Sequence, residues 1–261
     1  YRLYFPSPLY SHLYPGLCMV EVLRQGDELG AEWSFAKGKP DWIQRLGDIA
    51  ERSNSSQAII VSVVPNLTEM AVMTLEQSGV NSTVVSGDMD LPMKFDYGAL
   101  GKLGADRIAD AIGAWQFYGE DTDSLLVVDA GTAITIDLVR QGTFLGGAII
   151  PGLDMMKNAL YSNTAQLTLP DNKITAQFPG KGTEQCIVAG SISAAVGAIR
   201  FLWNKFIQKD EYARIILTGG DSKILAKFMK DEFILDNLLL VKGAIAIFDY
   251  CRMEKKNAEK I

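Results

Sequence analysis

The chain has 261 residues, of which 48% are hydrophobic and 21% are charged, a composition typical of a folded globular protein. Its net charge of -6 excludes a general basic surface for nucleic acid. The three cysteines, Cys18, Cys186 and Cys251, lie far apart and the chain has one histidine, which excludes a zinc-binding spacing and a disulfide framework. We expect a soluble protein of the reducing cytoplasm, with one large domain or two of about 130 residues.

The sequence also gives no sign of a membrane protein. No apolar run reaches the ~20 residues that a membrane span needs, and no basic-then-apolar signal peptide is recognisable. The chain begins at Tyr1 instead of Met, and residues 1–16 are rich in Tyr and Pro. We therefore expect neither a membrane nor nucleic acid among its partners.

The first half alternates short apolar runs with helical patterns. We expect strands at about 17–23, 28–35 and 58–64, and helices at about 41–53 and 67–78. The last of these strands is almost continuously apolar, which is typical of a strand that is covered on both faces. This alternation indicates an α/β fold.

The second half repeats the same order of elements. We expect strands at about 125–129, 133–140, 143–150 and 215–218, and helices at about 152–160 and 184–208 and from about 241. A further helix is expected at about 108–119, before this half begins.

The two halves also match in sequence. Residues 24–30 and 140–146 share five of seven residues at an offset of 116. Chance similarity between two tight hairpins is the alternative explanation, but the hairpins occupy the same place in the order of strands. We therefore expect a duplicated domain, with one copy in residues 1–118 and the other in residues 119–261.

The segment 127–137 contains the most informative turn of the chain. An apolar strand ends in Asp129, and Gly131 and Thr132 follow before the next strand. The carboxylate can hold a cation, the glycine lets backbone N–H groups approach an anionic oxygen, and the threonine adds a hydroxyl donor. The turn is therefore suited to phosphate, although a plain β-turn would also use Asp and Gly.

Two further segments complete a recognisable pattern, Gly104-Ala105-Asp106-Arg107 and Gly180-Lys181-Gly182-Thr183. Together with the Asp129 turn, they resemble the type III pantothenate kinases, which belong to the superfamily of sugar kinases and actin. The resemblance extends over roughly residues 17 to 250. It implies duplicated ribonuclease H-like domains with the active site in the cleft between them.

The same resemblance implies an activity and its cofactors. The chain would transfer the γ-phosphoryl group of ATP to pantothenate, the first step of coenzyme A biosynthesis, and would work as a homodimer. Magnesium would arrive with ATP and keep several waters, so few protein ligands are expected for it. Potassium would be held partly by Asp129, and Gly131 and Thr132 would contact ATP.

The resemblance also assigns the substrate side of the site. Asp106 would be the base that takes the proton of the pantothenate hydroxyl; an N-terminal helix cap is the alternative. Arg107 would hold the substrate carboxylate through a two-point contact, with a salt bridge as the alternative. Gly104 and Ala105 belong to the same segment. Tyr97 has the spacing of a substrate-contacting tyrosine, although packing under a loop would also explain it.

Three other positions are open to two interpretations. Thr183 would contribute to the pantothenate pocket of the neighbouring subunit, or it would cap the helix that follows it. The turn at 218–221 matches the adenosine side of the superfamily, although Gly-Gly after a strand is a weak signal. Thr135 and Asp137 share one face of a strand, where packing or solvation is expected more than binding.

One part of the family pattern is missing. Shifting the Asp129 turn back by 116 residues leads to Leu13-Tyr14-Pro15-Gly16, where the family carries an Asp-x-Gly-Asn-Thr phosphate loop. The alternative function is therefore a weak or inactive homologue that acts as a binding or regulatory protein. Another phosphotransferase or phosphatase of the superfamily is a third hypothesis.

Overall fold

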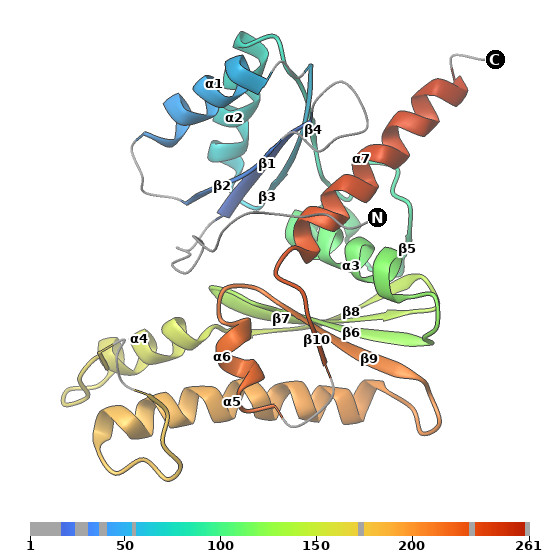
Figure 1. The fold of residues 1–261 in the computed structure, drawn as a ribbon. Helices are drawn as coiled ribbons and strands as arrows, with labels where there is room; N and C mark the ends of the chain where they lie inside the picture. Colours follow the sequence, from blue (N-terminus) through green and yellow to red (C-terminus); the bar gives the residue numbers. More distant parts are fainter. Residues whose placement is uncertain are drawn as a thin grey trace.

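The computed structural model of the protein describes residues 17–23, 31–36, 41–53, 56–171, 175–229 and 233–258. Its first sheet has four strands in the order β2-β1-β3-β4 (Figure 1). Strand β1 is antiparallel to both of its neighbours, and β4 is parallel to β3. The elements of this part are β1 (Leu17–Leu23), β2 (Ala31–Ala36), α1 (Trp42–Ser53), β3 (Gln57–Ser62), α2 (Pro65–Gln77) and β4 (Asn81–Val84).

The second sheet has six strands in the order β10-β9-β6-β7-β8-β5. Strand β6 pairs antiparallel with β7 and parallel with β9, and β10 extends the parallel part. The strands are β5 (Lys94–Phe95), β6 (Ser124–Ala130), β7 (Ala133–Arg140), β8 (Thr143–Pro151), β9 (Ala213–Thr218) and β10 (Phe233–Leu235). The helices are α3 (Ala105–Tyr118), α4 (Leu153–Asn163), α5 (Thr183–Phe206), α6 (Ser222–Ala226) and α7 (Leu239–Ala258), and η1 (Leu100–Lys102) is a short 3-10 turn.

The elements stack in layers. Helices α3 and α7 lie between the two sheets, whereas α4, α5 and α6 lie on the other face of the second sheet (Figure 1). Side chains alternate along β6, so Leu125 and Val127 pack in the core with α3 and α7, while Leu126 and Val128 pack in the core with α5. Both faces of β6 are therefore buried, which explains its continuously apolar sequence.

The two sheets share an arrangement with one difference. Shifting the bounds of β1 by the offset of 116 residues gives 133–139, which matches β7, and both strands are followed by an antiparallel neighbour. In the second sheet, however, β6 lies between β7 and β9, whereas β1 pairs directly with β3. The described part of the first sheet therefore contains no counterpart of β6. Residues 13–16, at the expected place of the phosphate loop, and residues 24–30, the first copy of the repeat, lie outside the described residues.

Most of the expected elements are confirmed, and so is the α/β class. The differences are mainly short elements that the sequence analysis did not predict: β4, β5, β10 and α6. Helix α3 begins at Ala105, three residues before the expected start. The boundary between residues 118 and 119 stays a prediction; β5, from the first half, pairs with β8 in the second sheet.

Helix α5 corrects the expectation that no apolar segment is long enough to span a membrane. In the part of the chain that the structure describes, this helix alone is long and apolar enough to cross a membrane by length and composition. Its apolar inner face packs in the core below the second sheet, through Ile192, Ala195, Val196 and Ile199. Core packing therefore accounts for at least one face of this helix.

Candidate active site

The phosphate turn lies at the end of β6, beside a second glycine turn. Asp129 pairs with Thr218 across the parallel strands β6 and β9. Gly219 follows with a φ of 89°, and a Cβ atom there would lie 2.2 Å from Oδ1 of Asp129. The Asp221 N–H donates to the carbonyl oxygen of Ala130 at 2.8 Å. Only glycine lets the second turn approach the Asp129 carboxylate this closely.

The start of α4 closes the other side of this turn. The Gly152 N–H donates to the carbonyl oxygen of Thr132 at 2.9 Å. A Cβ atom on Gly152 would lie 2.3 Å from the carbonyl oxygen of Gly131. No side chain caps the N-terminus of α4. The Gly131-Thr132 turn therefore lies beside uncapped helical N–H groups, an arrangement that favours an anion.

Asp106 lies in the first turn of α3, but it is not the residue that caps the helix. The N-cap residue is Gly104, and Oδ1 of Asp106 accepts the Arg107 N–H at 2.7 Å. A Cβ atom on Gly104 would lie 2.4 Å from Oδ1 of Asp106, so a larger residue there would displace this carboxylate. Burial raises the pKa of Asp106, while the backbone hydrogen bond and the charge of Arg107 act in the opposite direction. Burial thus makes this carboxylate a stronger proton acceptor than an exposed aspartate.

Arg107 is buried in an ion pair, which was the alternative interpretation of this residue in the sequence analysis. Its Nε donates to Oδ2 of Asp137 at 2.9 Å, and Nη2 donates to Oδ1. The guanidinium carbon lies 5.8 Å from the centre of the Tyr97 ring and 5.5 Å from that of Phe144. Burial alone would lower the pKa of Arg107, but the hydrogen bonds and charge of Asp137, together with the interaction with Tyr97, outweigh it and raise the pKa. The two-point contact of Arg107 is therefore already made within the chain.

Two further carboxyl groups adjoin the candidate site: Asp110, which the sequence analysis did not single out, and Asp137, for which it expected packing or solvation more than binding. Both are 3% exposed. Asp137 faces the α3 side of the sheet because it pairs with Val127 across β6 and β7. Asp110 lies one helical turn after Asp106, and its Oδ1 has no hydrogen-bond partner among the described residues. The i, i+4 spacing on α3 and the strand parity were the available signals.

Four carboxyl groups thus lie close enough to interact: those of Asp110 and Asp137 are buried, and those of Asp106 and Asp129 are partly buried. Burial raises the pKa of Asp110 well above its usual value, and the charges of Asp129, Asp106 and Asp137 add to this effect. The pKa of Asp129 is raised to about 7 by burial and by the charges of Asp106 and Asp137. Arg107 neutralises the charge of Asp137 directly. The negative charge of the other three carboxyl groups therefore favours protonation or the binding of cations.

The residues present fit a cation that receives only part of its ligands from the protein. No three His, Cys, Asp or Glu side chains within the described ranges lie close enough to hold a metal ion by themselves. The free Oδ1 of Asp110 and the glycine-lined Asp129 carboxylate offer oxygen ligands. Hard cations such as potassium and magnesium prefer such ligands and complete their shells with water or phosphate oxygens.

Tyr97 and Thr183 lie where solvent can reach them. The Tyr97 ring is 37% exposed and packs edge-on against Phe144, with a centroid distance of 5.9 Å. Thr183 is exposed and is the first residue of α5, while Gly182 is the N-cap residue. The alternative that Thr183 caps this helix is therefore wrong.

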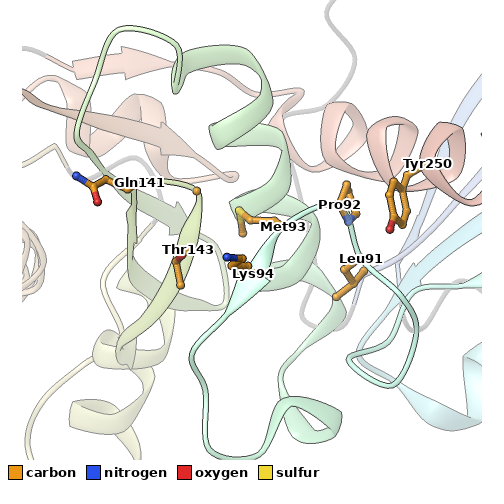
Figure 2. A pocket seen from close by; sticks show the side chains of 8 residues that line it. Leu91, Pro92, Met93, Lys94, Gln141, Thr143 and Tyr250 are labelled. Carbon is orange, nitrogen blue, oxygen red and sulfur yellow. The ribbon is translucent and has the colours of Figure 1, made fainter.

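A hollow of about 400 Å³ lies elsewhere, at the opposite end of strands β7 and β8. Figure 2 shows its lining side chains, which come from the start of β5 and the segment before it, from the β7–β8 turn and the start of β8, and from α7. Thr143 lines it and begins β8, whereas Pro151, at the end of β8, pairs with Ala133 next to the phosphate turn. At about 3.3 Å per residue, the length of β8 separates this hollow from the phosphate turn by more than 20 Å, whereas Asp137, which pairs with Gly147, lies about half as far along the strand.

The fold and these turns define a protein of duplicated ribonuclease H-like architecture, the class that includes sugar kinases and actin. The solved structure of a conserved Baf family transcriptional activator from Campylobacter jejuni has the same fold, with a TM-score of 0.57 and 21% identity. The match covers 86% of this chain and 92% of that one. The duplicated fold class expected from the sequence is therefore confirmed.

Comparison of sequences identifies the family. The type III pantothenate kinase family model matches residues 23–205. A type III pantothenate kinase of Thermosipho africanus is 33% identical over 76% of this chain and 80% of that protein. One of Fervidobacterium nodosum is 38% identical, over 60% of this chain and 59% of that protein. The chain belongs to the type III pantothenate kinase family.

Proposed function

We propose that this protein transfers the γ-phosphoryl group of ATP to pantothenate, giving 4′-phosphopantothenate and ADP at the start of coenzyme A biosynthesis in the cytoplasm. The observation that carries the proposal is the position of Asp106. Its partly buried carboxylate at the start of α3 is close enough to Asp129, on the phosphate turn, for their charges to interact. A proton acceptor and a phosphate-facing turn therefore adjoin one region between the two halves.

Each group would have a defined role in the transfer. The 4′-hydroxyl oxygen of pantothenate attacks the γ-phosphorus, its proton passes to Asp106, and the bond to the β–γ bridging oxygen breaks to release ADP. Gly131 and Thr132, beside the uncapped start of α4, bind the ATP phosphates. Magnesium bound to ATP and potassium near Asp129, when present, offset negative charge on the phosphates.

The substrate side would be formed by the residues around Arg107. Tyr97 is partly exposed and stacks on the guanidinium, so it can contact pantothenate on its free side. Gly104 and Ala105 let the backbone approach the substrate next to Asp106. Arg107 contributes through the position of its buried guanidinium, since its Nε and Nη2 are engaged by Asp137.

We further propose that the protein works as a homodimer through the outer face of α5. This face consists of exposed small residues and one large aromatic ring that is 60% exposed; it comprises Gly190, Ser193, Ala194, Gly197 and Phe201. A Cβ atom on Gly190 or Gly197 would have no neighbour within 4 Å. Small residues let a second helix pack closely, and Thr183 at the start of α5 would then enter the partner's pantothenate site.

A weak or inactive homologue is the second candidate function. The observation that favours it is the direct pairing of β1 with β3, at the place where β6 in the second sheet carries the phosphate turn. Losing one preorganised contact to the transferring phosphoryl group commonly reduces the rate by about 10²- to 10³-fold. Such a protein would still bind pantothenate.

The deciding experiment measures ATP-dependent formation of phosphopantothenate by the purified protein, with and without potassium. We expect Asp106→Asn to lose turnover by at least about 10³-fold while it keeps its fold and its affinity for pantothenate. Asp249→Asn, an exposed aspartate on α7, serves as the matched control and should retain full activity. If Asp106→Asn retained turnover, Asp106 would not be the base; binding of pantothenate without turnover by the parent would favour the second candidate.

A further inference from the structure

Arg107 and Asp137 form a buried ion pair. Its side chains are 8% and 4% exposed, respectively, and two hydrogen bonds join them. The residues come from different elements, α3 and β7, and lie 30 positions apart in the chain. A well-packed apolar pair would give similar or greater stability at such a buried place, so stability alone does not explain the ion pair.

The backbone around Asp137 is shaped to admit its carboxylate. The register between β7 and β8 shifts between Asp137 and Val139, which marks a bulge in the sheet. Opposite it, a Cβ atom on Gly147 would lie 2.5 Å from Oδ1 of Asp137 and 2.0 Å from the Ile136 carbonyl oxygen. Bulges next to active sites commonly aim a side chain. The bulge and the glycine together leave room for the Asp137 carboxylate beside β8.

The guanidinium that Asp137 holds is also clamped by two aromatic rings. Tyr97 and Phe144 both lie within 6 Å of it, and they pack edge-on against each other. Gly146 has a φ of 90°, and a Cβ atom there would lie 3.6 Å from the Tyr97 ring. The position of the partly exposed Tyr97 ring therefore depends on that of the Arg107 guanidinium, and through it on Asp137.

We propose that Asp137 is a positioning residue for pantothenate binding, because it fixes Arg107 and, through Arg107, the Tyr97 ring on the substrate side of the site. This inference rests on the proposed pantothenate kinase function. Asp137 acts on substrate affinity and not on the chemical step.

The test compares Asp137→Asn with the parent protein. The amide keeps the shape but loses the charge, so one charge-assisted hydrogen bond is weakened and another is lost. We expect the pantothenate KM, and the Kd by calorimetry, to rise about 10- to 100-fold. The kcat and the KM for ATP should change less than about threefold, since only binding of pantothenate is affected.

Glu211→Gln provides the matched control. Glu211 accepts hydrogen bonds from Arg140, the last residue of the same strand, and forms the second Arg–carboxylate pair of β7. If a pair is purely structural, its loss should lower the unfolding free energy and leave the pantothenate KM unchanged. Glu211→Gln should behave in that way. The same behaviour in Asp137→Asn would overturn the proposal.

A second variant covers the case in which Asp137→Asn does not fold. Arg107→Lys keeps the positive charge but cannot make the two-point contact, so it should raise the pantothenate KM similarly. Where both single variants fold, the double variant should be no worse than either, since the pair acts as one unit. Additive effects would overturn the proposal. A parent protein that neither binds nor phosphorylates pantothenate would instead overturn the proposed function.

Discussion

Replacing Asp129 by asparagine should stabilise the protein while it damages the site. The pKa of Asp129 is raised from 3.8 to about 7 by burial and by the charges of Asp106 and Asp137. A carboxyl group whose pKa is higher in the folded state binds its proton more tightly there. Folding therefore becomes less favourable as the pH rises from about 4 to about 7. A shift of this size corresponds to about 4 kcal/mol of unfolding free energy, at about 1.4 kcal/mol for each pKa unit.

Asparagine cannot ionise, so Asp129→Asn removes this pH-dependent penalty. The unfolding free energy of the variant should exceed that of the parent by about 4 kcal/mol more at pH 8 than at pH 4. Urea unfolding, followed by circular dichroism in buffers free of potassium, magnesium and nucleotide, measures the difference at both pH values. The same experiments on Asp249→Asn, which changes an exposed aspartate, should show no such gain.

The effect of potassium on the unfolding free energy tests the same electrostatic argument. Potassium should stabilise the parent at pH 8 and should stabilise Asp129→Asn much less, because the carboxylate that attracts the ion is gone. An equal stability gap between the two proteins at pH 4 and pH 8 would refute the electrostatic argument. Potassium stabilisation that is unchanged in the variant would remove Asp129 from the cation site.

Two other changes test the geometry of the turn and of the α5 face. Gly219→Ala should lower the unfolding free energy by about 3 kcal/mol and weaken ATP binding, because its Cβ atom would collide with the Asp129 carboxylate at a φ of 89°. In urea unfolding, Gly98→Ala, where a Cβ atom meets nothing within 4 Å, should be nearly neutral. Ala194→Arg, on the exposed face of α5, should convert a dimer into a monomer by light scattering and reduce turnover. A variant that remains dimeric would place the interface elsewhere.

The sequence predicted the long elements well because burial imposes a clear periodicity on them. Strand β1 was predicted with its observed bounds, and β6 to within one residue at each end. The missed elements, β4, β5, β10 and α6, have only two to five residues, too few for a periodic pattern. The start of α3 was placed too late because its N-cap residue is Gly104, which provides no capping side chain.

The site was predictable wherever one segment carried the information. The turn at Asp129 and the acid at Asp106 were both predicted from local motifs. The partner of Arg107 was not found, because it depends on how α3 lies across β7. The parity of β7 nevertheless contained a clue: a two-residue turn at 131–132 fixes the register that places Asp137 on the same face as Asp129. The sequence alone could not tell whether that face met solvent or α3.

The order of strands in the first sheet agrees with the absence of the first phosphate loop from the sequence. In the second sheet, β6 carries the Asp129 turn between β7 and β9. In the first sheet, β1 and β3 pair through six residue pairs, from Cys18 with Ser62 to Leu23 with Gln57. A strand in the position of β6 would have to separate these two. With β1 and β3 paired in this way, the described sheet offers no strand end from which a second phosphate turn could face the first. ATP would then be held by the second half alone, and the rate would fall before pantothenate affinity does, because the Tyr97, Asp106 and Arg107 group does not depend on that strand.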